Sequence, residues 1–319
     1  MNRSTVFCAL SLVFAATAVA QEPLKSLLDA RASHKTKLVR IAANSDPLEE
    51  PPRQLFKIVK YKSPVGAISA YLGADPEGDG KHPAIIWITG GIPPGGIGSS
   101  AWRREPSEND QSAKCYRQAG MVMMYPTLRG SFGNPGNQES FYGEVDDILA
   151  AADYLAKVPY VDPERIYLGG HSTGGTLALL VAAATDRFKA IFSFGPVESP
   201  SLYSPGNLTY DPEERTENRL RSPIHFLGAI QSPTFVIEGT GGYIEPFRKL
   251  QLACKNPKVV FLPVGDADHF KVLGPSNNVI AEKIAKLGSK AALSLTAFEL
   301  EKACATAEAS RPESPSPAP

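Results

Sequence analysis

The segment Gly169–Gly175 places a serine in a setting typical of a catalytic nucleophile. It reads Gly-Gly-His-Ser-Thr-Gly-Gly, so Ser172 is the centre of a G-x-S-x-G pattern between a segment expected to be a strand and one expected to be a helix. The flanking glycines permit the sharp strand-to-helix turn on which a strained serine exposes its hydroxyl. A phosphate-binding turn can also be rich in glycine, but this segment lacks the lysine of a nucleotide site. We therefore predict that Ser172 is a nucleophile.

A serine hydroxyl needs a base within hydrogen-bond reach before it can attack a carbonyl group at neutral pH. Of the five histidines, His269 follows the last expected strand and comes after the serine in the chain, which is the order that this kind of turn requires. His171 is enclosed in the turn itself, and His34, His82 and His225 lie in the lead-in, before a strand and in a variable region. We predict that His269 is the general base.

These two residues can meet only if the elements before them end at one edge of a sheet. The sequence predicts helices at residues 145–155, 173–184 and 278–287 and eight strands, at residues 56–61, 67–71, 84–89, 122–125, 165–168, 190–194, 234–238 and 259–263. Several strands are short apolar runs bounded by glycine or proline, as in strands buried on both faces of a parallel sheet. We expect an α/β fold, with a mostly parallel eight-stranded sheet and helices on both faces. Ligands of such sheets bind at the carboxyl ends of the strands.

The composition favours a globular protein that acts on a small molecule. Of the 319 residues, 43% are hydrophobic and 21% are charged, and the 33 basic residues balance the 33 acidic ones. A chain without net charge gives no reason to expect nucleic acid as a partner, and no stretch is long enough to predict membrane insertion. The sequence has no Walker motif, no HExxH and no CxxC pair, so we expect no cofactor and no metal site.

The two ends of the chain are expected to lie outside the fold. Residues 1–20 combine a positive start, an apolar run and the small residues Ala18-Val19-Ala20, which predicts a signal peptide and a secreted or periplasmic protein beginning near Gln21. Residues 21–54 form a lead-in, and residues 55–304 are the expected catalytic domain. Residues 305–319, rich in Ala, Glu, Ser and Pro, are predicted to be a disordered tail. After export Cys115, Cys254 and Cys304 would remain, which allows at most one disulfide.

The sequence resembles the α/β-hydrolase fold, and within it the catalytic domain of the prolyl oligopeptidase and dienelactone hydrolase group. The resemblance is carried by the serine motif and by four further segments. These are Leu128–Ser131, Gly143–Asp147, Val161–Tyr167 and Ser232–Thr234. It covers about residues 55–290 and implies a serine hydrolase that cleaves an ester or a peptide bond. We expect no counterpart of the large amino-terminal propeller of many such peptidases, because the lead-in before the first expected strand is short.

The resemblance leaves the third member of the expected triad open. The family usually places an aspartate three residues after the glycine that ends the seventh strand, and this chain has Gly242 there. An acid is needed to hold the imidazole of the base in the correct tautomer. We favour Glu238, at the end of that strand, with Glu198 second and Asp266 or Asp268 as further choices.

The oxyanion of an acyl-transfer reaction needs two hydrogen-bond donors that are already in place. One is expected to be the backbone N–H of Thr173, directly after the nucleophile. The resemblance puts the other in the loop Thr89–Gly96, with Gly91 as the expected donor.

Residues 199–231 form either a small lid over the strand ends or a solvated loop. Two functions therefore stay open. The chain is either a serine hydrolase that works through an acyl-enzyme on Ser172, or a non-catalytic binding protein that has lost its triad acid.

Overall fold

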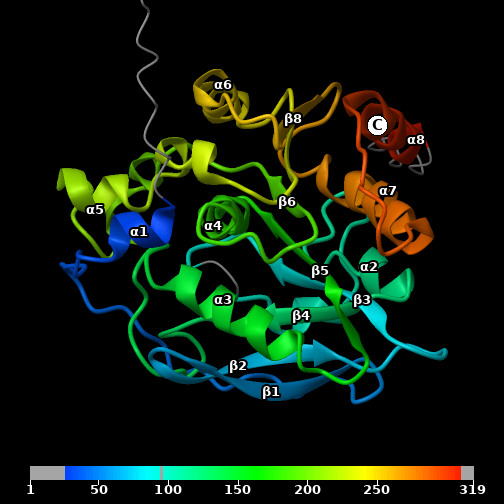
Figure 1. Ribbon diagram of the computed structural model, residues 1–319, viewed down its shortest axis with the longest axis horizontal. Helices are drawn as coiled ribbons and strands as arrows, with labels where there is room; N and C mark the ends of the chain where they lie inside the picture. The colour runs from blue at the N-terminus through cyan, green and yellow to red at the C-terminus, as the bar shows by residue number, and fades with distance from the viewer. Residues whose placement is uncertain (1–25, 94–95, 310–319) are drawn as a thin grey trace, which may run out of the picture.

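A single sheet of eight strands organises the molecule (Figure 1). The computed structural model describes residues 26–93 and 96–309. The strands are β1 (Phe56–Ser63), β2 (Gly66–Gly73), β3 (His82–Ile88), β4 (Val122–Pro126), β5 (Val161–His171), β6 (Ile191–Phe194), β7 (Thr234–Gly239) and β8 (Val259–Val264). Their order is β1-β2-β4-β3-β5-β6-β7-β8, and every pair from β4 to β8 is parallel. Only β2 runs against its neighbours. The predicted α/β sheet is confirmed.

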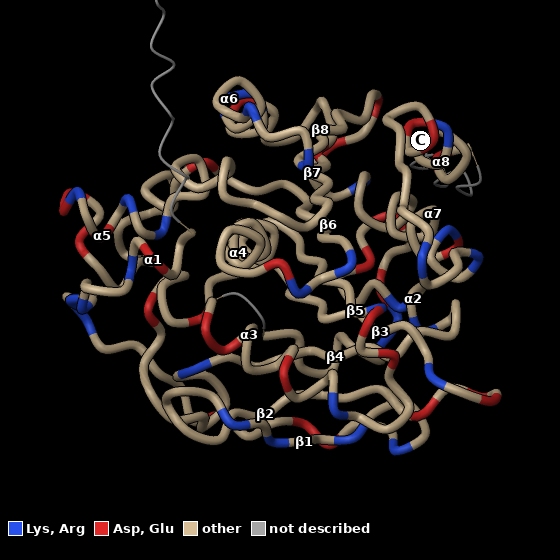
Figure 2. The backbone as a smooth tube through the Cα atoms, viewed as in Figure 1, with Lys and Arg blue, Asp and Glu red and all other residues tan. Residues whose placement is uncertain are grey.

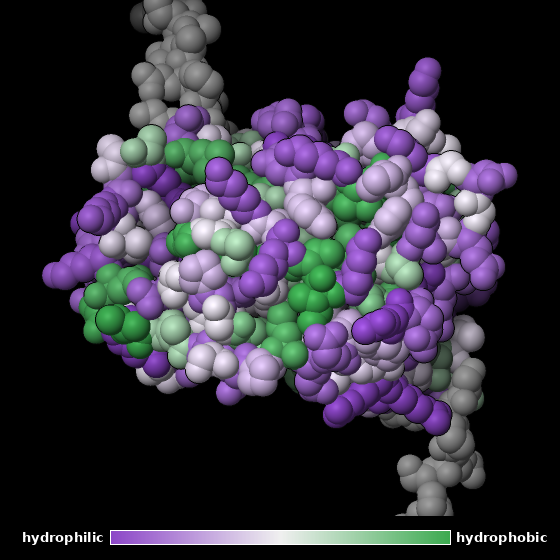
Figure 3. Space-filling model, turned by 90° about the horizontal axis from the view of Figure 1, so that it is seen from below, coloured by the Kyte–Doolittle hydropathy of each residue, from purple (hydrophilic) through white to green (hydrophobic). Residues whose placement is uncertain are grey.

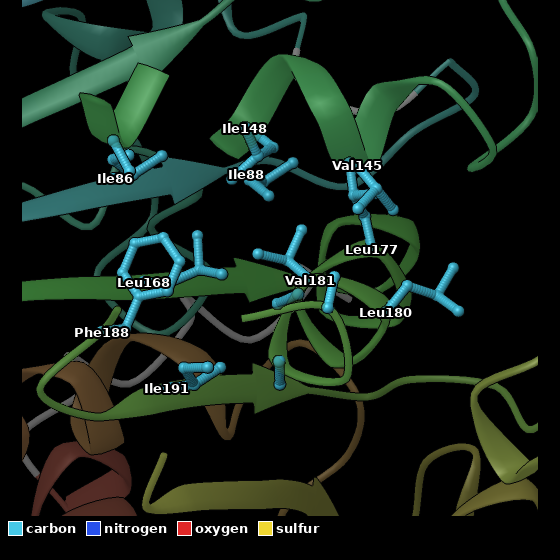
Figure 4. Close-up of a cluster of buried hydrophobic side chains, with 14 of the residues drawn as sticks. Ile86, Ile88, Val145, Ile148, Leu168, Leu177, Leu180, Val181, Phe188 and Ile191 are labelled. Atoms are coloured by element: carbon cyan, nitrogen blue, oxygen red, sulfur yellow. The ribbon is translucent and has the colours of Figure 1, made fainter. Parts of the chain in front are cut away.

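Helices cover both faces of this sheet. The helices are α1 (Leu27–Arg31), α2 (Cys115–Gln118), α3 (Glu144–Leu155), α4 (Thr173–Ala182), α5 (Arg215–Arg219), α6 (Ile244–Ala253), α7 (Leu273–Lys286) and α8 (Ala297–Ala309). Helices α1, α3, α4 and α6 contribute to one buried cluster, and α2, α7 and α8 to the other. Alternate residues of β3 face the two clusters, since Ile86 lies in the first and Ile85 in the second. Figure 4 shows Ile86, Ile88 and Leu168 of the sheet packed toward Val145 of α3 and Leu177 of α4.

The surface carries charges of both signs without a large block of either. In Figure 2, the Lys and Arg positions and the Asp and Glu positions are scattered along the backbone tube, with long stretches of other residues between them. The face on the side of β1 and β2, in Figure 3, is largely hydrophilic with hydrophobic groups between. None of the helices in the described part of the chain is long and apolar enough to cross a membrane.

The predicted disordered tail is wrong for its first residues. Helix α8 continues through Ala309, whereas the tail was expected to begin at residue 305. Leu300 and Cys304, one turn apart, are buried in the cluster with α7 and β8 and anchor the helix. Of the five helical residues that follow, three are alanine and one is glutamate, both good helix formers, so the helix continues through them. The expected signal peptide, residues 1–20, and the rest of the tail lie outside the described residues.

The three cysteines of the described chain are free thiols, so the one disulfide that their number allowed is not formed. Burial raises the pKa of Cys115 to about 12 and that of Cys304 to about 11. Both thiols are therefore held in the unreactive protonated form.

Candidate active site

Ser172 lies at a strained turn between β5 and α4. Its φ of 57° and ψ of −117° are outside the regions that residues with a side chain prefer. The turn is held close to its neighbours, because the Ser172 N–H donates to the Phe194 carbonyl at 2.8 Å. A Cβ at Gly174 would overlap the Ile88 carbonyl at the end of β3, so glycine is required there. The Ser172 hydroxyl does not cap α4, which leaves it available for other partners.

His269 and Glu238 form a buried pair at the carboxyl edge of the sheet. Glu238 is the next-to-last residue of β7, and His269 lies in the loop that follows β8. The Nδ1 atom of His269 is 2.8 Å from Oε2 of Glu238. Glu238 is fully buried and His269 is 5% exposed. The other carboxylate oxygen, Oε1, accepts a hydrogen bond from the Gly239 N–H at 2.8 Å. The carboxylate is thus held at both oxygens and aimed at the imidazole.

The other acids considered from the sequence have different partners. Glu198 makes an ion pair with Lys249 at 2.7 Å. Asp268 accepts hydrogen bonds from the Phe270 and Lys271 backbone N–H groups at 2.9 and 2.8 Å, and so caps the turn that follows His269. Asp266 lies at a turn with a left-handed backbone, with φ 55°, and the carboxylate that contacts Nδ1 of His269 is that of Glu238. Of these carboxylates, the structure brings Glu238 to His269.

The absence of a side chain at Gly242 leaves room for the Glu238 carboxylate. A Cβ at this position would overlap Oε1 of Glu238 and would lie 2.6 Å from the backbone nitrogen of His269. The space that an aspartate at position 242 would need is therefore filled by the Glu238 carboxylate. Glu238 in this position and a side chain at position 242 therefore exclude each other.

The expected oxyanion residues lie next to the nucleophile. The Thr173 hydroxyl donates to the Gly91 carbonyl at 2.5 Å, which ties the loop after β3 to the start of α4. Gly91 has a φ of 107°, which glycine adopts readily. Thr89, Gly90, Gly91 and Ser172 line one hollow of about 400 Å³. The roles of Thr173 and Gly91 as donors stay predictions.

The segment 199–231 is packed against the domain at several points. The Tyr203 hydroxyl is 3.3 Å from that of Thr176, in the first turn of α4, and its ring stacks on Phe141 with centroids 5.9 Å apart. The buried Glu217 accepts from the Lys37 backbone N–H at 2.6 Å and so attaches the lead-in to this segment. The segment is therefore a fixed part of the wall near α4, with exposed residues between its anchors.

Sequence reasoning missed two side chains that support the site. His171, directly before the nucleophile, donates from Nε2 to the His269 carbonyl at 2.9 Å. Its Nδ1 then accepts from the Gln111 amide at 3.0 Å. This connection fixes the tautomer of His171 and joins three segments that are distant in the sequence. The glycine-rich motif signals that His171 is enclosed, but nothing in the sequence indicates that Gln111 reaches it.

Burial, with a smaller effect from neighbouring His269, lowers the pKa of His171 from 6.5 to about 3. Below pH 6.5 the unfolded chain binds a proton at this residue, and the folded chain does not until about pH 3. We therefore expect the free energy of unfolding to fall as the pH drops through this range, by up to about 1.4 kcal/mol per pH unit from this group. Chemical denaturation of wild type and His171→Gln between pH 7 and 4.5 measures the difference. Equal slopes in the two proteins would contradict it.

Three comparisons with known proteins find relatives among α/β-hydrolases and peptidases. A model of the prolyl oligopeptidase family, peptidase S9, matches residues 107–243. The chain is 27% identical over 186 residues to the uncharacterized peptidase YtmA of Bacillus subtilis. That match covers 52% of this chain and 65% of the peptidase, so the chain spans less than two thirds of its relative.

Two solved structures share the fold. The 2,6-dihydroxy-pseudo-oxynicotine hydrolase superposes with a TM-score of 0.58 at 18% identity, over 77% of this chain and 73% of that one. An acylaminoacyl peptidase bound to Z-Gly-Gly-Phe-chloromethyl ketone gives 0.59 at 19% identity, over 77% and 44%. The family match includes Ser172 and Glu238, and the superpositions extend the likeness to most of the sheet. The chain carries an α/β-hydrolase domain that resembles the catalytic domains of the prolyl oligopeptidase family.

Proposed function

We propose that this protein is an exported serine hydrolase that cleaves an ester or peptide bond through an acyl-enzyme on Ser172. The observation that carries the proposal is the buried contact between Glu238 and His269 at 2.8 Å, at the sheet edge where the strained serine turn also lies. A carboxylate enclosed with an imidazole serves to orient it and to stabilise its protonated form.

Each residue of the site has a defined role in the proposed reaction. Ser172 Oγ attacks the carbonyl carbon, and its proton passes to Nε2 of His269, since Nδ1 faces Glu238. The N–H groups of Thr173 and Gly91 stabilise the negative oxygen that develops. The proton then moves from His269 to the leaving group, which departs and leaves an ester on Ser172. A water molecule, activated by the same imidazole, releases the acid product.

A non-catalytic binding protein with the same fold is the second candidate. Loss of the triad acid at Gly242 was the feature that favoured it. The position of Glu238 weakens this argument, because the carboxylate fills the space beside Gly242 and contacts the imidazole.

A fluorophosphonate probe tests the proposed nucleophile directly, since it reacts with an activated serine hydroxyl. We expect one probe per chain, at Ser172, and no labelling of Ser172→Ala. Peptide mapping by mass spectrometry identifies the site. A folded wild-type protein that does not react, or that reacts elsewhere, would contradict the proposed function.

Export is part of the proposal and rests on the sequence of residues 1–20. Expression of the full chain in a bacterium followed by cell fractionation tests it. We expect the processed protein outside the cytoplasm, with an amino terminus near Gln21. An unprocessed protein in the cytoplasm would contradict export and leave the catalytic proposal unaffected.

A further inference from the structure

We propose that the active site selects neutral acyl groups carrying an aromatic or other apolar ring, and that Phe270 contacts this ring. The proposal rests on the proposed function and names its substrate class. It comes from the chemistry of the hollow in front of Ser172 and from the aromatic residues around His269.

The hollow in front of Ser172 has no charged side chain among the described residues that line it. Besides glycines, His171 and Ser172, its walls are formed by Thr89, Ile97, Ser100, Asn109, Gln111 and Phe270. The low pKa of His171, caused by burial, keeps this residue neutral at physiological pH. The loop sequence from Gly90 to Gly96 contains no ionisable residue either. A substrate amine or carboxylate placed here would lose water without gaining a partner of opposite charge.

Two exposed aromatic rings flank His269, and one of them, Phe270, also lines the hollow. The Phe270 ring meets the His269 ring edge-on with centroids 5.0 Å apart and lies 5.8 Å from that of His171. The Tyr243 ring meets His269 edge-on at 4.6 Å. Phe270 is 50% exposed and Tyr243 is 58% exposed, although each borders a buried imidazole. Exposed aromatic surface at the edge of a pocket is well suited to receive another ring.

One buried hydroxyl in the wall of the hollow takes no part in this selection. The Thr89 hydroxyl is inaccessible to solvent and has no hydrogen-bond partner within the described chain. Buried polar atoms are nearly always paired. Because water does not reach this oxygen, a substrate does not reach it either. The preference for a neutral acyl group with an apolar ring therefore rests on the uncharged lining of the hollow and on the exposed Phe270 ring.

The charge preference is tested with three p-nitrophenyl esters that differ only at the far end of one ring. They are the esters of 4-(acetamidomethyl)benzoic acid, 4-(aminomethyl)benzoic acid and 4-(carboxymethyl)benzoic acid, which are neutral, cationic and anionic at pH 7. We expect kcat/KM for the neutral ester to exceed that of each charged ester at least tenfold. A smaller advantage over either would overturn the proposal.

The contact with Phe270 is tested by the ratio of kcat/KM for p-nitrophenyl phenylacetate to that for p-nitrophenyl acetate. We expect Phe270→Ala to lower this ratio at least fivefold and Phe270→Leu to restore part of it. Phe298, 73% exposed on α8, gives a matched control, since Phe298→Ala should leave the ratio unchanged. An unchanged ratio in Phe270→Ala would overturn the contact.

Failure of this inference is distinguishable from failure of the proposed function. If Ser172 reacts with the fluorophosphonate probe but the esters show no charge or ring preference, or are not cleaved, the substrate class is wrong and the nucleophile stands. If the probe does not react, the proposed function itself fails.

Discussion

Replacing Ser172 with alanine is expected to abolish turnover of p-nitrophenyl acetate in a protein that keeps its fold. The side chain lost is a single hydroxyl that does not cap α4, while the backbone bond to Phe194 remains. Alanine also lacks the nucleophile, so no acyl-enzyme can form. Removal of the serine from a well-studied triad costs about 10⁶ in kcat, and we expect a loss of at least about 10⁵. Circular dichroism checks the fold, and Ser289→Ala, at an exposed serine after α7, provides the control.

The same assay separates a catalytic unit from two independent residues. His269→Ala is expected to lose nearly as much activity as Ser172→Ala, and the double variant little more than either, because nucleophile and base act together. If the two losses multiplied, His269 would have a role apart from the serine. Substantial activity in folded Ser172→Ala would contradict the nucleophile itself.

The fold could be predicted because local and global signals agree in this chain. All eight strands overlap the predicted ranges, several of which are short apolar runs bounded by glycine or proline, and helices α3, α4 and α7 overlap the three predicted helices. Helix α6 was missed because Pro246 interrupts its pattern, although proline is tolerated in a first turn. Helix α8 was not predicted, and its last five residues were assigned to the disordered tail because of their composition; the packing of the helix on α7 is a property of the folded chain.

The candidate site could be predicted in part. Ser172 and His269 are indicated by their motif and by their places after two strands. The choice between Glu238 and Glu198 depends on where two loops meet, which the sequence does not encode at any fixed spacing. The contact of Gln111 with His171 joins residues 60 positions apart, and it is likewise a property of the folded chain. The catalytic roles of these residues stay predictions until they are measured.

Glu238→Gln is expected to lower kcat by about 10⁴, the loss that the equivalent change causes in a serine protease triad. The physical reason is the tautomer of His269. The Gly239 N–H donates to Oε1 of Glu238, so the amide oxygen of a glutamine would keep this place and its NH₂ group would face Nδ1 of His269. Nδ1 must then accept, the proton moves to Nε2, and Nε2 can no longer take the proton of Ser172.

Glu198→Gln is the matched control for this prediction. Glu198 is also buried, at 8% exposure, and makes a charged contact, but its partner is Lys249. If burial of a carboxylate near the sheet edge were all that mattered, the two variants would behave alike. We expect Glu198→Gln to change kcat less than tenfold and to affect mainly stability.

Kinetics of the two variants with p-nitrophenyl acetate decide where the acid is. A large loss of kcat with little change in KM in Glu238→Gln alone places the orienting acid at the end of β7, since the interaction removed is made mainly in the transition state. The reverse pattern would move the acid to Glu198. A loss of less than about tenfold in Glu238→Gln would withdraw the assignment, because an imidazole free to adopt either tautomer does not need the carboxylate. Gly242→Ala should also lower kcat without any change in charge, because its new methyl group would crowd both Oε1 of Glu238 and the backbone nitrogen of His269 and so disturb the pair.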